Sequence, residues 1–164
     1  MAIRTFITAL ALLGAAPLSH AMSASGMIEQ VFEMNPEADV HIYDHVYHSI
    51  SKHELGNVIA EHARRIKRFG RSDRYRHFDC DDYTVTFKAV VALHSLFRGK
   101  NFACGIMVVK QQHTFAGIKG GDDVYHALNL ILVDGVPTVL EPQNYKQVPL
   151  SEYPNRKFIL GLIL

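Results

Sequence analysis

The dipeptide Asp134-Gly135 constrains the fold more than any other feature of the sequence. It lies between two runs rich in aliphatic and β-branched residues, YHALNLILV (125–133) and VPTVLEP (136–142). An Asp-Gly pair between such runs is the strongest short-range signal of a β-hairpin with a two-residue turn. The sequence therefore predicts two antiparallel strands joined at Asp134-Gly135.

The predicted hairpin brings polar side chains to one face. With a two-residue turn, Leu128 lies opposite Glu141 and His126 lies opposite Gln143. Side chains alternate between the faces of a strand, so all four point to the same side. His126 and Glu141 are then diagonal neighbours, within reach of long side chains. A slip of one residue in the turn would send them to opposite faces.

The segments before the hairpin carry helix signals. Ser51 and Glu54 form an S-x-x-E capping box at the start of a helix that ends at Gly70. A second helix is predicted from Asp79 or Asp81 to about residue 97, because apolar residues recur at helical spacing. Its continuous stripe predicts one buried face and consists of Tyr83, Phe87, Val90, His94 and Phe97.

Two further β-rich runs, 101–110 and 157–164, complete the pattern. Helices come first and strands follow, which predicts an α+β fold with N-terminal helices packed on an antiparallel sheet. The chain has 164 residues, of which 48% are hydrophobic and 20% charged. This length and composition suit one globular domain with a substantial core.

The first 21 residues have the three parts of a secretory signal peptide. Arg4 supplies a positive charge, the apolar run ITALALLGAA follows, and Ser19 and Ala21 occupy positions −3 and −1 of a cleavage site. The apolar run is too short to span a bilayer. We therefore expect a signal peptide over 1–21, a single domain over 22–164, and export to a periplasm or the cell exterior. A buried N-terminal helix is the alternative.

The charge balance limits the partners of the domain. Removal of Arg4 with the leader leaves as many basic as acidic residues. Nucleic acids and anionic membranes both select proteins with a basic excess. We therefore expect neither as a partner, and no other segment is apolar for long enough to span a membrane.

Cys80 lies in FDCDDY, at the predicted start of the second helix, and is one of two cysteines. In an oxidising compartment, two cysteines suggest a disulfide between Cys80 and Cys104. Alternatively, a helix N-terminus and a nearby imidazolium lower the pKa of a thiol, which would make Cys80 a nucleophile. Both interpretations remain open at this point.

The segments DCDDY, YHALNLILVDG and LEPQN together resemble the papain-like and transglutaminase-like cysteine peptidases. Two branches are similar, the bacterial transglutaminase-like cysteine proteinases and the peptidase domain at the C-terminus of a fungal agglutinin, over about residues 47–143. The resemblance implies Cys80 as nucleophile, His126 as general base, Glu141 as the group that orients it, and Gln143 near the substrate or oxyanion. The implied activity is hydrolysis of a peptide or amide bond through a thioester, with a protein or peptide substrate and no cofactor required for the chemistry.

The bacterial branch of that family also binds calcium through acids that flank its cysteine. Asp79 and Asp81 match those positions, and carboxylate oxygens suit a hard cation. The same two residues also suit the cap of a helix. Calcium is therefore implied by the resemblance alone.

Other interpretations compete with the peptidase. A peptidoglycan amidase of the NlpC/P60 type shares the order Cys then His, but its usual D-C-S-G is D-C-D-D here. A non-catalytic binding domain with the same fold would keep the hairpin without a reactive thiol. A domain stapled by a Cys80–Cys104 disulfide would have both thiols blocked. The sequence does not indicate a substrate or an oligomeric state.

Overall fold

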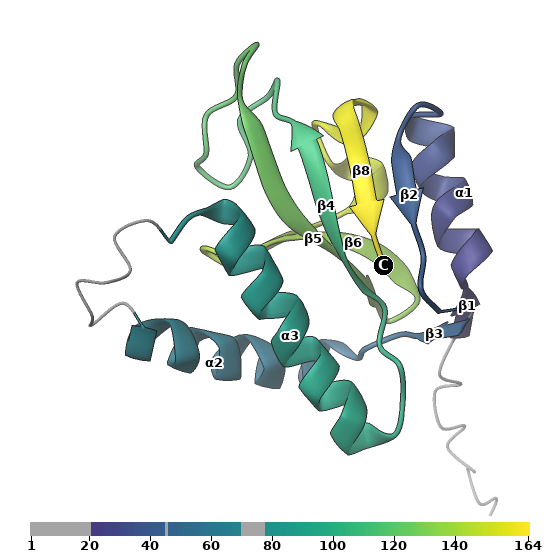
Figure 1. Ribbon diagram of the computed structural model, residues 1–164, viewed down its shortest axis with the longest axis vertical. Helices are drawn as coiled ribbons and strands as arrows, with labels where there is room; N and C mark the ends of the chain where they lie inside the picture. The colour runs from purple at the N-terminus through teal and green to yellow at the C-terminus, as the bar shows by residue number, and fades with distance from the viewer. Residues whose placement is uncertain (1–20, 45, 70–77) are drawn as a thin grey trace, which may run out of the picture.

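The computed structural model describes residues 21–44, 46–69 and 78–164 (Figure 1). The chain forms an α+β fold, as predicted. The predicted signal peptide falls almost entirely outside the described residues and stays a prediction. The elements follow in the order β1 (Ala21–Ser23), α1 (Ala24–Met34), β2 (Asp39–His41), β3 (Val46–His48), α2 (Lys52–Phe69), α3 (Cys80–Arg98), β4 (Cys104–Lys110), β5 (Tyr125–Val133), β6 (Val136–Glu141), β7 (Lys146–Pro149), η2 (Leu150–Glu152), η3 (Arg156–Phe158) and β8 (Ile159–Ile163).

The main sheet has six strands in the order β2-β8-β4-β5-β6-β7. Its pairs are antiparallel, as predicted, except for the parallel pair of β2 and β8 at one edge. β1 and β3 form a separate two-stranded sheet. The short strands β1, β2 and β3 all precede α2, and β2 belongs to the main sheet. The predicted order, with helices first and strands afterwards, therefore holds only for the longer elements.

The predicted hairpin register is confirmed. Val133 pairs with Val136 and Asn129 pairs with Leu140. Asp134 and Gly135 have φ values of 46° and 83°, and positive φ at both central residues is the requirement of the tight turn that matches strand twist. The Asp-Gly pair therefore sets the register of β5 against β6.

The starts of α2 and α3 also follow the sequence signals. The Glu54 backbone N–H donates to the Ser51 hydroxyl at 3.2 Å, and the Glu54 carboxylate accepts from the Ser51 hydroxyl at 3.0 Å, at the start of α2. Asp79 immediately precedes α3, and Gly99 ends it with φ of 60°, a left-handed conformation that glycine adopts without strain.

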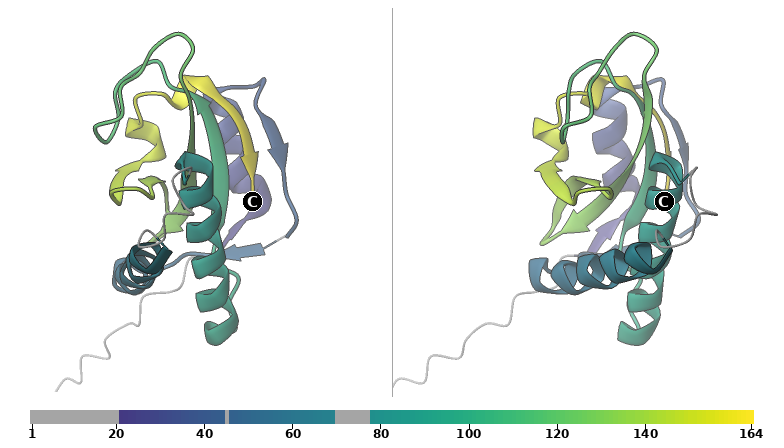
Figure 2. Two further views of the ribbon diagram at one scale, coloured as in Figure 1. Left: turned by 60° about the vertical axis from the view of Figure 1, so that its left-hand side comes forward. Right: turned by 90° about the vertical axis from the view of Figure 1, so that its left-hand side faces the viewer.

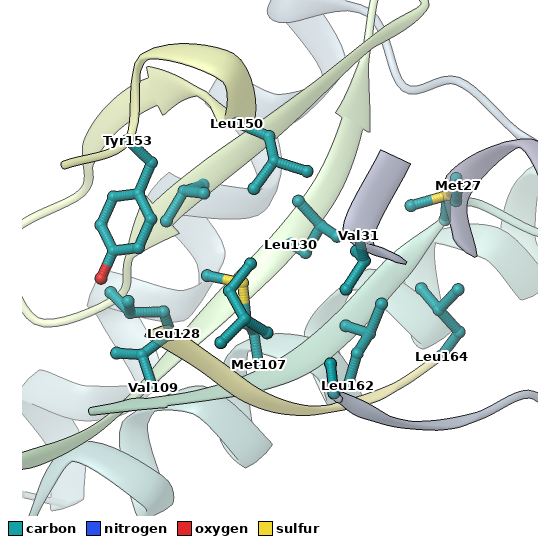
Figure 3. Packing of buried hydrophobic residues seen from close by; sticks show 14 of the residues in the cluster. Met27, Val31, Met107, Val109, Leu128, Leu130, Leu150, Tyr153, Leu162 and Leu164 are labelled. Carbon is teal, nitrogen blue, oxygen red and sulfur yellow. The ribbon is translucent and has the colours of Figure 1, made fainter. Parts of the chain in front are cut away.

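Hydrophobic side chains pack on both faces of the sheet. One cluster lies on the side of α1, η2 and η3 and includes Met107, Leu128, Leu130 and Tyr153 (Figure 3). The other lies on the side of α2 and α3 (Figure 2). Alternate residues of β5 therefore pack in different hydrophobic clusters.

The stripe predicted along α3 is buried only in part. Phe87 and Val90 are buried, whereas Leu96 and Phe97 are 76% and 84% exposed. The prediction that Phe97 packs in the core is wrong, because the C-terminal end of α3 extends beyond the sheet (Figure 1). No helix of the described residues is long and apolar enough to cross a membrane.

Candidate functional site

The hairpin brings His126 and Glu141 into direct contact. His126 Nε2 lies 2.5 Å from Glu141 Oε2, and the two side chains are 5% and 0% exposed. The diagonal pairing expected from the two-residue turn is therefore confirmed. Burial on both sides makes this a polar contact inside the core, where an unpaired partner would be costly.

Gln143 joins this pair through its backbone and not through its side chain. Its N–H donates to Glu141 Oε1 at 3.0 Å, and its side chain is exposed. The expected pairing of Gln143 with His126 does not form, because the ladder of β5 and β6 stops at Asn129 and Leu140. The chain turns after Glu141, whose carbonyl accepts from the Tyr145 N–H at 2.7 Å.

Cys80, Asp79 and Asp81 form a second, exposed polar group at the start of α3. One ligand atom from each lies within 4.8 Å of the others. A hydrogen bond between the two carboxyl groups raises the pKa of Asp79 and lowers the pKa of Asp81. The hydrogen bond therefore favours a state in which Asp79 is protonated and Asp81 is ionised.

The two polar groups come from different elements, the start of α3 and the hairpin of β5 and β6. Alternation along β5 puts His126 on the same face as Leu128, which belongs to the cluster on the α1 side. α3 packs on the other face, where the Asn129 amide donates to the Thr84 carbonyl at 3.2 Å. Among the described residues, no hydrogen bond or ion pair joins Cys80 to His126. That Cys80, His126, Glu141 and Gln143 form one site stays a prediction.

Both cysteines are free thiols. Cys80 is half-buried, whereas Cys104 is buried and its Sγ accepts from the Asn129 amide at 3.8 Å. Burial raises the pKa of Cys104 to about 12, so its thiol stays protonated. The Cys80–Cys104 disulfide considered from the sequence is absent.

Two polar residues that hold the helices to the sheet were not singled out from the sequence. Asn129 is fully buried and also donates to the Gly105 carbonyl at 3.2 Å. The ring of His62 on α2 is buried, and its Nδ1 lies 2.9 Å from the Tyr145 hydroxyl. Asn129 could have been noticed as the one amide inside an aliphatic strand, whereas the sequence carries no sign of the His62–Tyr145 contact.

Known proteins offer a likeness in structure but not in sequence. No protein-family model matches the chain, and no curated protein is similar to it. A solved complex of PSL1a with E64 shares the fold with a TM-score of 0.63 and 16% identity, over 88% of this chain and 51% of that chain. Polyporus squamosus lectin, solved with the human-type influenza-binding epitope Neu5Acα2-6Galβ1-4GlcNAc, has a TM-score of 0.62 and 18% identity, over 88% of this chain and 49% of that chain. This chain thus spans about half the length of each.

These similarities correct the functional prediction. One of the solved structures that share the fold is that of a lectin bound to a sugar epitope. No family model and no curated protein supports a papain-like peptidase. The predicted cysteine peptidase, with a peptide as its substrate, is therefore wrong, and a papain-like core is not confirmed. The non-catalytic binding domain agrees better with these findings. At this level of identity the likeness establishes the fold alone.

Proposed function

We propose that this domain binds carbohydrate and is not an enzyme. The observation that carries the proposal is the fold shared with Polyporus squamosus lectin, which was solved with a sialylated trisaccharide, over 88% of this chain. Because the chain spans only 49% of that lectin chain, the sugar specificity of the whole lectin is not transferred. The proposal concerns carbohydrate as a ligand class.

The burial of His126 and Glu141 supports a structural role for this pair. A general base must come within hydrogen-bond distance of the proton that it removes. His126 is 5% exposed and Glu141 is fully buried, which leaves little of the pair accessible to a large substrate. The contact instead joins the start of β5 to the end of β6.

The test is a glycan array probed with the purified protein, followed by calorimetry with Neu5Acα2-6Galβ1-4GlcNAc and with the array's best glycan. We expect selective binding that the free sugar competes away. Cys80→Ala should bind with unchanged affinity, because the thiol has no part in recognition. Absence of binding to every glycan would overturn the proposal, and so would cleavage of a protein substrate that Cys80→Ala abolishes.

We also propose export of this domain, on the evidence of the N-terminal sequence. Cleavage after Ala21 should leave Met22 as the first residue. Mass spectrometry of the protein from its native host would determine the N-terminus. A mature protein that retains Met1 and Arg4 would contradict export by this route.

Asp79 and Asp81 are the candidate ligands for calcium. The two carboxylates lie close enough to share an ion, but calcium takes about six to eight oxygen ligands, and the adjacent Cys80 offers a soft sulfur that suits other metals. We propose calcium binding at this group on the proximity of the Asp79 and Asp81 carboxylates. A calcium-dependent rise in melting temperature that Asp79→Asn removes would support it, and equal melting in calcium and in chelator would refute it.

A further inference from the structure

A pocket of about 230 Å³ lies between α3, the segment before β3 and the start of β4. We call it the α3–β3 pocket. The side chains that matter for recognition are Tyr43, Tyr47, Lys88, Ser95, Asn101 and Phe102. It is separate from the His126–Glu141 pair and from the acids beside Cys80, none of which lines it.

Tyr47 supplies a buried polar group to the lining of the pocket. The Tyr47 side chain is 3% exposed, and its hydroxyl has no hydrogen-bond partner among the described residues. Burial raises the pKa of Tyr47, an effect that the nearby Asp44 backbone partly offsets. Buried polar atoms of native proteins nearly always have a partner. A ligand hydroxyl in the pocket would supply one.

Three more polar groups face the same space with hydrogen-bonding capacity left. Lys88 Nζ donates to the Cys104 carbonyl at 2.6 Å, which uses one of its three donors. Ser95 Oγ accepts from the Phe102 N–H at 3.1 Å and retains its own O–H donor. Asn101 donates to the Val46 carbonyl at 3.4 Å, which leaves its amide oxygen as an acceptor. The pocket therefore offers donors and acceptors together, as a polyhydroxylated ligand requires.

The charges and the volume of the pocket limit the kind of ligand that it can bind. Lys88 and Asp44 both line it, so their opposite charges favour a neutral ligand. Tyr43 stands beside the pocket with 77% of its surface exposed, and an aromatic ring offers a flat apolar face to the C–H groups of a sugar. The volume is below the roughly 300–1,000 Å³ of sites for drug-sized ligands, which suits a single ring.

We infer that the α3–β3 pocket binds one neutral sugar unit, a hexose or an N-acetylhexosamine. The inference rests on the proposed carbohydrate-binding function and adds to it the site and the kind of unit. The Tyr47 hydroxyl hydrogen-bonds a sugar hydroxyl inside the pocket, Lys88 and Asn101 bind others, and Tyr43 covers the face of the ring at the rim.

The experiment measures glycan affinity for the purified protein and three variants, Tyr47→Phe, Tyr43→Ala and the control Tyr125→Ala. Galactose, N-acetylglucosamine and N-acetylneuraminic acid are titrated separately, together with the best glycan of the array. Tyr47→Phe removes one hydroxyl and should weaken binding about fivefold to tenfold, the effect of one neutral hydrogen bond. Tyr43→Ala should weaken it by a similar factor. Tyr125 is 61% exposed and lies outside the pocket, so its variant should bind like the unmodified protein.

Thermal melting separates recognition from folding. Tyr47→Phe removes a buried hydroxyl that lacks a partner, so its melting temperature should stay equal or rise while affinity falls. Glycan binding that persists unchanged in both pocket variants would overturn the inference and leave the proposed function intact. Preference for N-acetylneuraminic acid over both neutral sugars would overturn the assignment of a neutral unit. If no glycan binds the unmodified protein, the proposed function fails, and the inference fails with it.

Discussion

The β5–β6 hairpin and helix α3 have equally regular sequence patterns, yet the fold buries them to different extents. From His126 to Val133 every residue of β5 is buried, and so is β6 from Pro137 to Glu141. α3 buries only Thr84, Phe87, Val90 and Val91. Both of its ends are exposed, the acidic start beside Cys80 and the apolar end at Leu96 and Phe97.

The difference follows from the position of each element in the layers. β5 and β6 lie inside the six-stranded sheet, with hydrophobic clusters on both faces. A helix packs with one face, and only along the length that its neighbours reach (Figure 2). Periodicity therefore identifies the face of a helix that can be buried, but not how much of that face the rest of the chain covers.

The largest effect should come from the middle of α3. Phe87→Ala removes a fully buried ring that packs 5.3 Å from the ring of His62, and such substitutions lower the free energy of unfolding by about 3–5 kcal/mol. Phe97→Ala, on the same predicted stripe but 84% exposed, should change it by less than about 0.5 kcal/mol. Urea denaturation measures both. Equal losses would show that the stripe is buried along its whole length and would contradict the structure.

A somewhat smaller loss should come from the polar contact inside the hairpin. Glu141→Ala leaves the His126 ring and the Gln143 N–H without their acceptor, and each buried unpaired group costs about 1–3 kcal/mol. We therefore expect a loss of about 2–4 kcal/mol in the free energy of unfolding. Glu152→Ala, on an exposed carboxylate of η2, is the matched control and should be nearly neutral. A loss below about 1 kcal/mol for Glu141→Ala would show that water replaces the contact.

The sequence predicts the hairpin well because its determinants are local. The turn type depends on Asp134 and Gly135, and alternation then brings His126 next to Glu141. The helix caps at Ser51 and Gly99 are local for the same reason. These contacts follow from residues that are near one another along the chain or are linked by a single tight turn.

Other features could not be predicted, because they depend on long-range packing. The parallel pairing of β2 with β8 joins Asp39 to Gly161, two residues at opposite ends of the domain. Whether Cys80 lies beside His126 depends on how α3 packs against the sheet. The order of Cys, His and Glu along the chain carries no information about that packing.

His62 lies where the two regions meet and should make stability depend on pH. Burial lowers its pKa from 6.5 to about 4. Between pH 4 and pH 6.5 the unfolded chain binds more protons than the folded protein. The free energy of unfolding therefore rises as the pH rises through this range and decreases as the pH falls. With allowance for partial solvent screening, the change should be about 2 kcal/mol. Urea denaturation between pH 4 and pH 7 measures it.

The control for this pH dependence is a second histidine of α2. His62→Gln should flatten the slope of stability against pH, whereas His53→Gln, on an exposed residue of the same helix, should leave the slope as it is. An equal slope in the unmodified protein and in His62→Gln would mean that another group produces it. That result would exclude His62 as the cause of the pH dependence of stability.

The smallest effect should appear at the exposed start of α3. The hydrogen bond to Asp81 holds the pKa of Asp79 above its ordinary value, so Asp81→Asn should return it toward that value by removing the neighbouring charge and the shared proton. Carboxyl chemical shifts followed by NMR through an acid titration measure the change, and Asp122→Asn, on an exposed carboxylate outside this group, is the control. Because both carboxyl groups are exposed, the melting temperature should stay the same at neutral pH. A fall in melting temperature comparable with that of Glu141→Ala would mean that the start of α3 is as buried as the hairpin, and the contrast between the two regions would no longer hold.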